Sequence, residues 1–160
     1  EMDQKITAGE GALEKERIRL FWDGMPVWGK LRYFSELFKE NASAVVASTY
    51  CNSWVFDFDL DDPLLSMARA YTGIFINRSE EVKEKVLAGL IDEYQIDVVS
   101  YHDSKTCPHN SNNRFGLPQR LQQETKVPYL VVDGDLNDLR CFSQEQTTTS
   151  LEAFVEQLSE

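Results

Sequence analysis

Short apolar runs alternate with helical patterns along this chain of 160 residues. The strand patterns are runs of Val, Ile, Leu, Phe and Ala between turn residues, and they cover 17–22, 44–50, 97–101 and 127–132. The helical patterns have apolar residues at every third or fourth position, and they cover 28–41, 63–71, 79–94, 117–125 and 149–158. The run at 44–50 is apolar enough to be buried on both faces, as in a parallel sheet. The alternation predicts an α/β fold.

The four strands should form one parallel sheet, because the helix after each strand returns the chain to the same edge. We predict one α/β domain at 17–160, a flavodoxin-like three-layer sandwich with a four-stranded sheet of order 2-1-3-4. Ligands of such sheets bind where the strand order reverses, outside the carboxyl ends of the first and third strands. That crevice would lie between 23–28 and 102–107. Residues 1–16 predict a linker or a lead-in helix.

The formal charge of −11 argues against nucleic acid as a partner, because a phosphate-binding surface needs the opposite sign. Solubility explains the acidity equally well. No apolar run approaches the roughly 20 residues that span a bilayer, and we expect no membrane partner. Three widely spaced cysteines do not indicate a disulfide framework and favour a reducing cytoplasm. No GxGxxG or P-loop motif follows any predicted strand.

A polar loop leaves the third predicted strand and contains Cys107. A thiolate there can bind iron or zinc or act as a nucleophile, although an ordinary solvated loop explains the same composition. His102, at the end of that strand, can donate a proton or can be satisfied by Asp103 or the backbone. Cys51 and Cys141 follow the second and fourth strands, and each reads equally as a small buried hydrophobic residue.

Two further groups of residues carry alternative interpretations. The carboxylates of Asp133, Asp135 and Asp138 can bind a cation, or they can cap the next element and pair with Arg140. An aromatic run that follows the second strand can line a ligand channel or plug the top of the sheet. The run consists of Trp54, Phe56 and Phe58.

Five segments occur in a specific order and spacing: 45–50 with Trp54, 62–68, 101–108, 134–140 and 151–154. Together they resemble the carboxyl-terminal half of subunits in the 2-hydroxyacyl-CoA dehydratase and benzoyl-CoA reductase family. The loop at 102–116 and the segment at 134–146 look most like the B-type subunit of ATP-dependent benzoyl-CoA reductase. The resemblance covers nearly everything after Arg17.

This resemblance implies an oxidoreductase that reduces an acyl-CoA thioester with low-potential electrons, after which water is lost or an aromatic ring is reduced. It implies a [4Fe-4S] cluster with Cys107 as one ligand and two cysteines from an amino-terminal domain. The implied partners are that domain, a related iron–sulfur subunit, an ATP-hydrolysing activator and acyl-CoA. We expect His102 as a proton donor to the reduced substrate, and Tyr50 and Trp54 as pocket walls.

The chain departs from the family pattern in two respects. Residues 1–16 are too few to hold the amino-terminal domain, so we expect a fragment of a larger subunit that is inactive and lacks a stable cluster when alone. Ser150 replaces an arginine that the family often has before Leu151. We expect part of a benzoyl-CoA reductase. The alternatives are a 2-hydroxyacyl-CoA dehydratase domain and a cofactor-free assembly module, and contacts of Cys51 or Cys141 with iron stay open.

Overall fold

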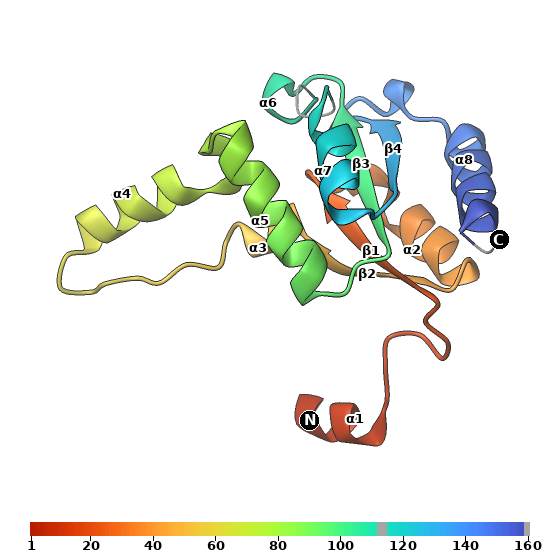
Figure 1. Ribbon diagram of the computed structural model, residues 1–160, viewed down its shortest axis with the longest axis horizontal. Helices are drawn as coiled ribbons and strands as arrows, with labels where there is room; N and C mark the ends of the chain where they lie inside the picture. Colours follow the sequence, from red (N-terminus) through yellow and green to blue (C-terminus); the bar gives the residue numbers. More distant parts are fainter. Residues whose placement is uncertain (112–114, 159–160) are drawn as a thin grey trace.

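The computed structural model describes residues 1–111 and 115–158. These residues form a parallel sheet with strand order β2-β1-β3-β4. The strands are β1 (Ile18–Asp23), β2 (Ser43–Ser48), β3 (Val98–Ser104) and β4 (Tyr129–Gly134). Helices flank both faces of the sheet, as Figure 1 shows. The predicted α/β class and the order 2-1-3-4 are therefore confirmed.

Each face of the sheet packs against its own pair of long helices (Figure 1). On one face, Phe21 of β1 packs with side chains of α5 (Glu80–Glu93) and α7 (Leu117–Thr125). On the other, Leu20 and Trp22 pack with η1–α2 (Trp28–Lys30 and Leu31–Glu40) and α8 (Gln144–Gln157). Successive residues of β1 point to opposite faces, which is the alternation that a strand imposes on its side chains.

The register of the sheet brings the carboxyl ends of the strands to one edge. Asp23 of β1 lies opposite Tyr101 of β3, and Ser104 of β3 lies opposite Gly134 of β4. Short helices continue the chain from this edge: α3 (Thr49–Asn52), α6 (Pro108–Ser111) and η4 (Leu139–Cys141). Residues that follow different strands are thereby gathered at the place predicted for a ligand.

Three local predictions were wrong. β2 is an edge strand that pairs only with β1 among the described residues, and Val45 is 45% exposed, so the strand is not buried on both faces. The last helix begins at Gln144 instead of Thr149, because the Ser143 hydroxyl caps it by accepting from the Gln146 N–H at 3.2 Å. Residues 108–111 of the predicted polar loop form α6, and residues 112–114 lie outside the described residues.

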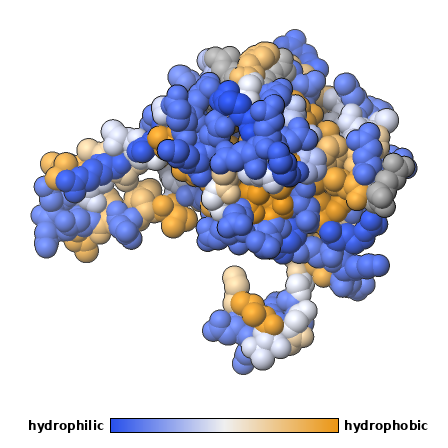
Figure 2. All heavy atoms as spheres, in the orientation of Figure 1, coloured by the Kyte–Doolittle hydropathy of each residue, from blue (hydrophilic) through white to orange (hydrophobic). Residues whose placement is uncertain are grey.

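Two segments extend from the body of the domain in Figure 1. One is α1 (Met2–Ala8), which buries no residue. The other, here called the arm, comprises residues 54–77 with α4 (Pro63–Gly73) and η2 (Phe75–Asn77). Most of its large apolar side chains are exposed, as the orange atoms in Figure 2 indicate; among them are Trp54, Val55, Phe56, Phe58, Leu60, Leu64 and Tyr71. Among the described residues, no helix combines the length and the apolar character that crossing a membrane requires.

Candidate functional site at the carboxyl edge of the sheet

A cavity of about 120 Å³ opens where the strand order reverses, between the carboxyl ends of β1 and β3. We call it the Cys107 cavity. Its walls come from the segments that follow β1, β2 and β3, together with residues near η2. They include Asp23, Met25, Thr49, Tyr50, Ser53, Trp54, Phe75, Ser104, Cys107, His109 and Asn110. Cavities at this position of a parallel sheet are the usual ligand sites of doubly wound folds.

Cys107 is half-buried on the wall of this cavity. Its backbone N–H donates to the Ser104 carbonyl at 3.1 Å, and its own carbonyl accepts from the Asn110 N–H at 3.0 Å. These two bonds join the end of β3 to α6 and fix the turn that carries the thiol. The side chain therefore stands at the tips of the strands, where the sequence predicts it, and not within the aliphatic core.

Asp135 anchors the residue before this thiol. The backbone N–H and the hydroxyl of Thr106 both donate to Asp135 Oδ2, at 2.8 and 2.7 Å. The Thr106 hydroxyl and the backbone N–H groups of Asn137 and Asp138 hold the pKa of Asp135 well below its usual range. Asp135 is thus a structural acceptor that ties the Cys107 turn to β4. Asp138 pairs with Arg140 at 2.6 Å, so this acidic cluster behaves as the capping and pairing alternative predicted.

Gly24 and Asn110 link the other walls. Gly24 adopts a φ of +92°, and its N–H donates to Thr49 Oγ1 at 2.7 Å. Asn110 Nδ2 donates to the His102 carbonyl at 2.7 Å. A Cβ on Gly24 would lie 2.8 Å from the Asn110 amide, so the absent side chain allows these loops to meet. The three strand ends around the cavity are consequently held together by direct contacts.

Asp23 is a carboxyl group at the cavity that the sequence analysis did not single out. It is 3% exposed, and Oδ1 has no hydrogen-bond partner in the described structure. Burial raises the pKa of Asp23 to about 6, against opposing effects of a hydrogen bond with Thr49 and the charge of Lys83. Such a carboxyl can gain or release a proton close to neutral pH. The available signal was an acid that ends an otherwise apolar strand.

His102 is buried, 2% exposed, and is not among the residues that line the Cys107 cavity. Its Nδ1 lies 2.6 Å from the carbonyl oxygen of Met25, which can only accept, so Nδ1 carries the hydrogen in the neutral ring. Burial lowers the pKa of His102. The ring lies near Trp22, with 6.0 Å between centroids, on the α2 side of the sheet. The structure thus separates His102 from the thiol while linking it to the cavity wall through Met25.

Tyr50 and Trp54, the two predicted pocket walls, both line the Cys107 cavity. Their ring centroids are 6.3 Å apart in an edge-to-face arrangement, and Trp28 continues the series at 5.6 Å from Tyr50. Trp54 is 53% exposed, so this aromatic wall is open and does not plug the sheet. The structure therefore brings Tyr50, Trp54 and Cys107 together.

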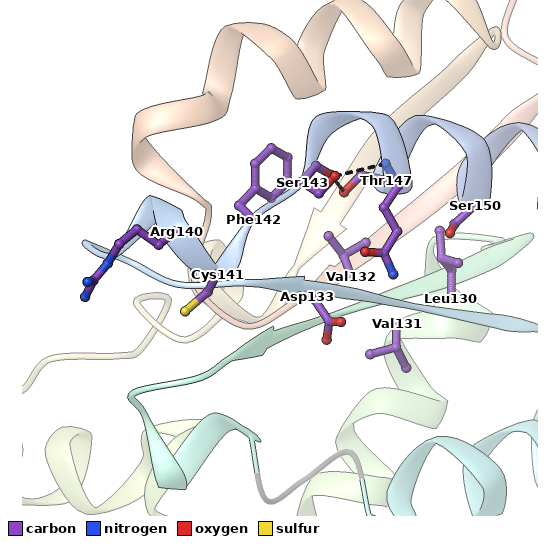
Figure 3. Close-up of a pocket in the computed structure, with 11 residues that line it drawn as sticks. Leu130, Val131, Val132, Asp133, Arg140, Cys141, Phe142, Ser143, Thr147 and Ser150 are labelled. Carbon is purple, nitrogen blue, oxygen red and sulfur yellow. Dashed lines mark hydrogen bonds between the residues drawn. The ribbon is translucent and has the colours of Figure 1, made fainter.

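The three cysteines do not converge. Cys51 is exposed and lines a separate cavity along β2 and α2, so the expectation that it is buried was wrong. Cys141 lines a third cavity of about 210 Å³, shown in Figure 3, between β4 and the start of α8. Among the described residues, no group of three or more His, Cys, Asp or Glu side chains could hold a metal ion. A [4Fe-4S] cluster takes about four ligands, so the residues described do not by themselves fit one.

Comparison with known proteins agrees with the site's position in the fold. Residues 1–158 match the family model described as 2-hydroxyglutaryl-CoA dehydratase, D-component. The chain is 31% identical to the alpha subunit of lactoyl-CoA dehydratase of Anaerotignum propionicum over 160 residues, which are 99% of the chain and 38% of that protein. It is 28% identical to the B-type subunit of benzoyl-CoA reductase of Thauera aromatica over 171 residues, which are 100% of the chain and 40% of that protein.

A third relative extends the same pattern. The (R)-2-hydroxyisocaproyl-CoA dehydratase alpha subunit of Clostridioides difficile is 26% identical over 161 residues, which are 100% of the chain and 39% of that protein. The chain thus spans about two fifths of the length of these curated relatives. Because the family model covers nearly the whole chain, the protein belongs to the 2-hydroxyglutaryl-CoA dehydratase, D-component, family.

Proposed function

We propose that this chain is the part of a 2-hydroxyacyl-CoA dehydratase subunit that presents Cys107 to an iron–sulfur cluster beside the acyl group of the substrate. The observation that carries the proposal is the half-buried thiol on the wall of a cavity at the carboxyl edge of the sheet. The wall contains aromatic side chains, which would keep water away from a low-potential centre. The family membership and the dehydratase relatives support the reaction class.

The cluster in this proposal is shared with protein outside the 160 residues. Cys107 would supply one ligand, and a preceding amino-terminal domain would supply others. Bound there, the cluster would pass single electrons to the thioester. This chain would orient the acyl group against Tyr50 and Trp54. The remaining partners that we propose are a related iron–sulfur subunit and an ATP-hydrolysing activator, in a cytoplasm that keeps the cysteines reduced.

His102 serves in this proposal to position the cavity. Its ring holds the Met25 carbonyl at 2.6 Å, and Met25 lies on the cavity wall. Direct proton donation to the substrate stays a prediction, because the ring would need access that its 2% exposure does not give. Asp23, which lines the cavity, is better placed to exchange a proton there.

A second candidate is the benzoyl-CoA reductase reaction. The aromatic series of Trp28, Tyr50 and Trp54 beside the cavity favours a flat aromatic acyl group, which can stack or meet ring edges. The relationship to the B-type subunit of benzoyl-CoA reductase supports it as well. We rank it second because the family model and four of the five relatives found carry dehydratase names.

Substrate turnover separates the two candidates. The complete subunit, combined anaerobically with its related subunit, activator and ATP, is expected to convert a 2-hydroxyacyl-CoA to the 2-enoyl-CoA with loss of water. Chromatography of the CoA esters measures the products, and omission of ATP is the control. Consumption of benzoyl-CoA instead would select the reductase. Failure to transform both classes of thioester would contradict the proposed function.

A further inference from the structure

A second and larger cavity, of about 450 Å³, lies between the arm and α5. We call it the arginine cavity because Arg69 and Arg78 line it. It shares three wall residues with the Cys107 cavity: Thr49, Ser53 and Phe75. The two cavities are therefore neighbours along one continuous stretch of surface. A ligand longer than either cavity can occupy both.

The two arginines carry charge that the described residues do not neutralise. Arg69 belongs to α4 and Arg78 follows η2, and neither guanidinium forms an ion pair or a hydrogen bond within residues 1–111 and 115–158. By contrast, Arg19, Arg32, Arg120 and Arg140 each pair with a carboxylate. In a chain with a net charge of −11, two cations left over on one cavity are unexpected unless an anion completes them.

The remainder of the cavity is mostly apolar. Its walls include Val55, Phe56, Phe75, Val82, Val86 and Leu90. Asp57 is the acidic residue on this wall, so the two arginines still leave a net positive charge. A cavity with cations on an apolar wall suits an anion that has an apolar or aromatic part. Arginine binds phosphate groups especially well, because its planar donors match their geometry.

We propose that the arginine cavity binds the phosphate end of an acyl-CoA, and that the pantetheine arm runs past Thr49, Ser53 and Phe75 into the Cys107 cavity. The identity of the carrier rests on the proposed function. The continuity of the two cavities favours this carrier over a free nucleotide, because a nucleotide would leave the shared wall and the Cys107 cavity empty. The same guanidinium chemistry would hold the phosphates of ADP, so the experiment must separate the two.

Calorimetric titration of the protein in phosphate-free, low-salt buffer tests the anion site. Propionyl-CoA is expected to bind, pantetheine without phosphate groups is expected to bind at least about 10-fold more weakly, and ADP is expected to fall between them. Each of Arg69→Gln and Arg78→Gln should weaken propionyl-CoA binding about 10-fold. Arg32→Gln, remote from the cavity and also exposed, is the matched control and should bind as the parent does.

Two results would overturn the anion site: unchanged propionyl-CoA affinity in both cavity variants, or equal affinity for pantetheine and propionyl-CoA. ADP binding as tightly as propionyl-CoA would overturn the proposed path to Cys107. Circular dichroism of each variant checks the fold. Because both arginines are exposed, their replacement should leave the spectrum unchanged.

Alkylation of the cysteines tests the path independently. Saturating propionyl-CoA, which has no free thiol, is expected to slow the reaction of Cys107 with iodoacetamide at least about fivefold, as measured by mass spectrometry of the peptides. Cys51 and Cys141 lie in other cavities and serve as internal controls that should react at unchanged rates. Equal protection of all three cysteines, or protection of none, would contradict the path. Iron binding by Cys107 is measured separately, so failure of this inference leaves the proposed function standing.

Discussion

Replacing Asp23 by asparagine is expected to raise the free energy of unfolding at pH 7.5 by up to about 3 kcal/mol, with little change at pH 4. Asp23 is 3% exposed, and burial raises its pKa to about 6 from an ordinary value of 3.8. The folded protein must therefore hold a charge without its full hydration at neutral pH. Asparagine keeps the size and the hydrogen-bonding oxygen and removes the charge.

The direction with pH follows from the raised pKa in the folded state. Below the unfolded pKa the carboxyl is protonated in both states, and its contribution is fully present. As the pH rises through about 6, the unfolded chain releases the proton more readily, and that stability is lost. Urea denaturation of parent and Asp23→Asn between pH 4 and 7.5 measures the difference. A difference that stays constant across this range would show that the charge of Asp23 is not the cause.

Replacing Gly134 by alanine is expected to lower the free energy of unfolding by about 2 kcal/mol, because the added methyl group overpacks a filled site. The new Cβ would lie 2.8 Å from Nε2 of His102 and 3.2 Å from Cγ2 of Val27. The His102 ring cannot retreat easily, since its Nδ1 is held by the Met25 carbonyl at 2.6 Å. Thermal and urea denaturation measure the loss.

Gly89→Ala is the matched control for this substitution. Gly89 lies within α5, and a Cβ there would meet no atom within 4 Å. Alanine is the better helix former, so this variant should be more stable than the parent by about 0.5–1 kcal/mol. If both glycine variants changed stability in the same direction, close contact with His102 would not explain the effect at Gly134.

The sequence was most informative where one face of an element is apolar. The stripe of Leu117 and Leu121 predicts the helix at 117–125 with the bounds that the structure has. The start of α8 was hidden because residues 144–150 are Gln, Glu, Thr and Ser without an apolar stripe, and only the Ser143 cap marks it. The exposure of Val45 depends on β2 lying at the sheet edge, which the strand's own residues do not encode.

The site was predictable only as far as topology determines it. The strand order brings Cys107, Tyr50 and Trp54 to one cavity, and this follows from the carboxyl ends of the strands. The separation of Cys51 and Cys141 depends on side-chain directions in short helices, which residue spacing does not reveal. The importance of Asp23 and of Arg69 depends on burial and on missing partners, and these are properties of the packed structure.

The iron content of the complete subunit tests the central claim most directly. After anaerobic reconstitution, the parent and the variants Cys51→Ser and Cys141→Ser are expected to hold equal iron per subunit, with the charge-transfer absorbance of an iron–sulfur cluster. Cys107→Ser should lose most of both, because a cluster with one thiolate missing is poorly held. Iron retained by Cys107→Ser at the level of the parent would contradict the account, and so would equal losses in all three variants.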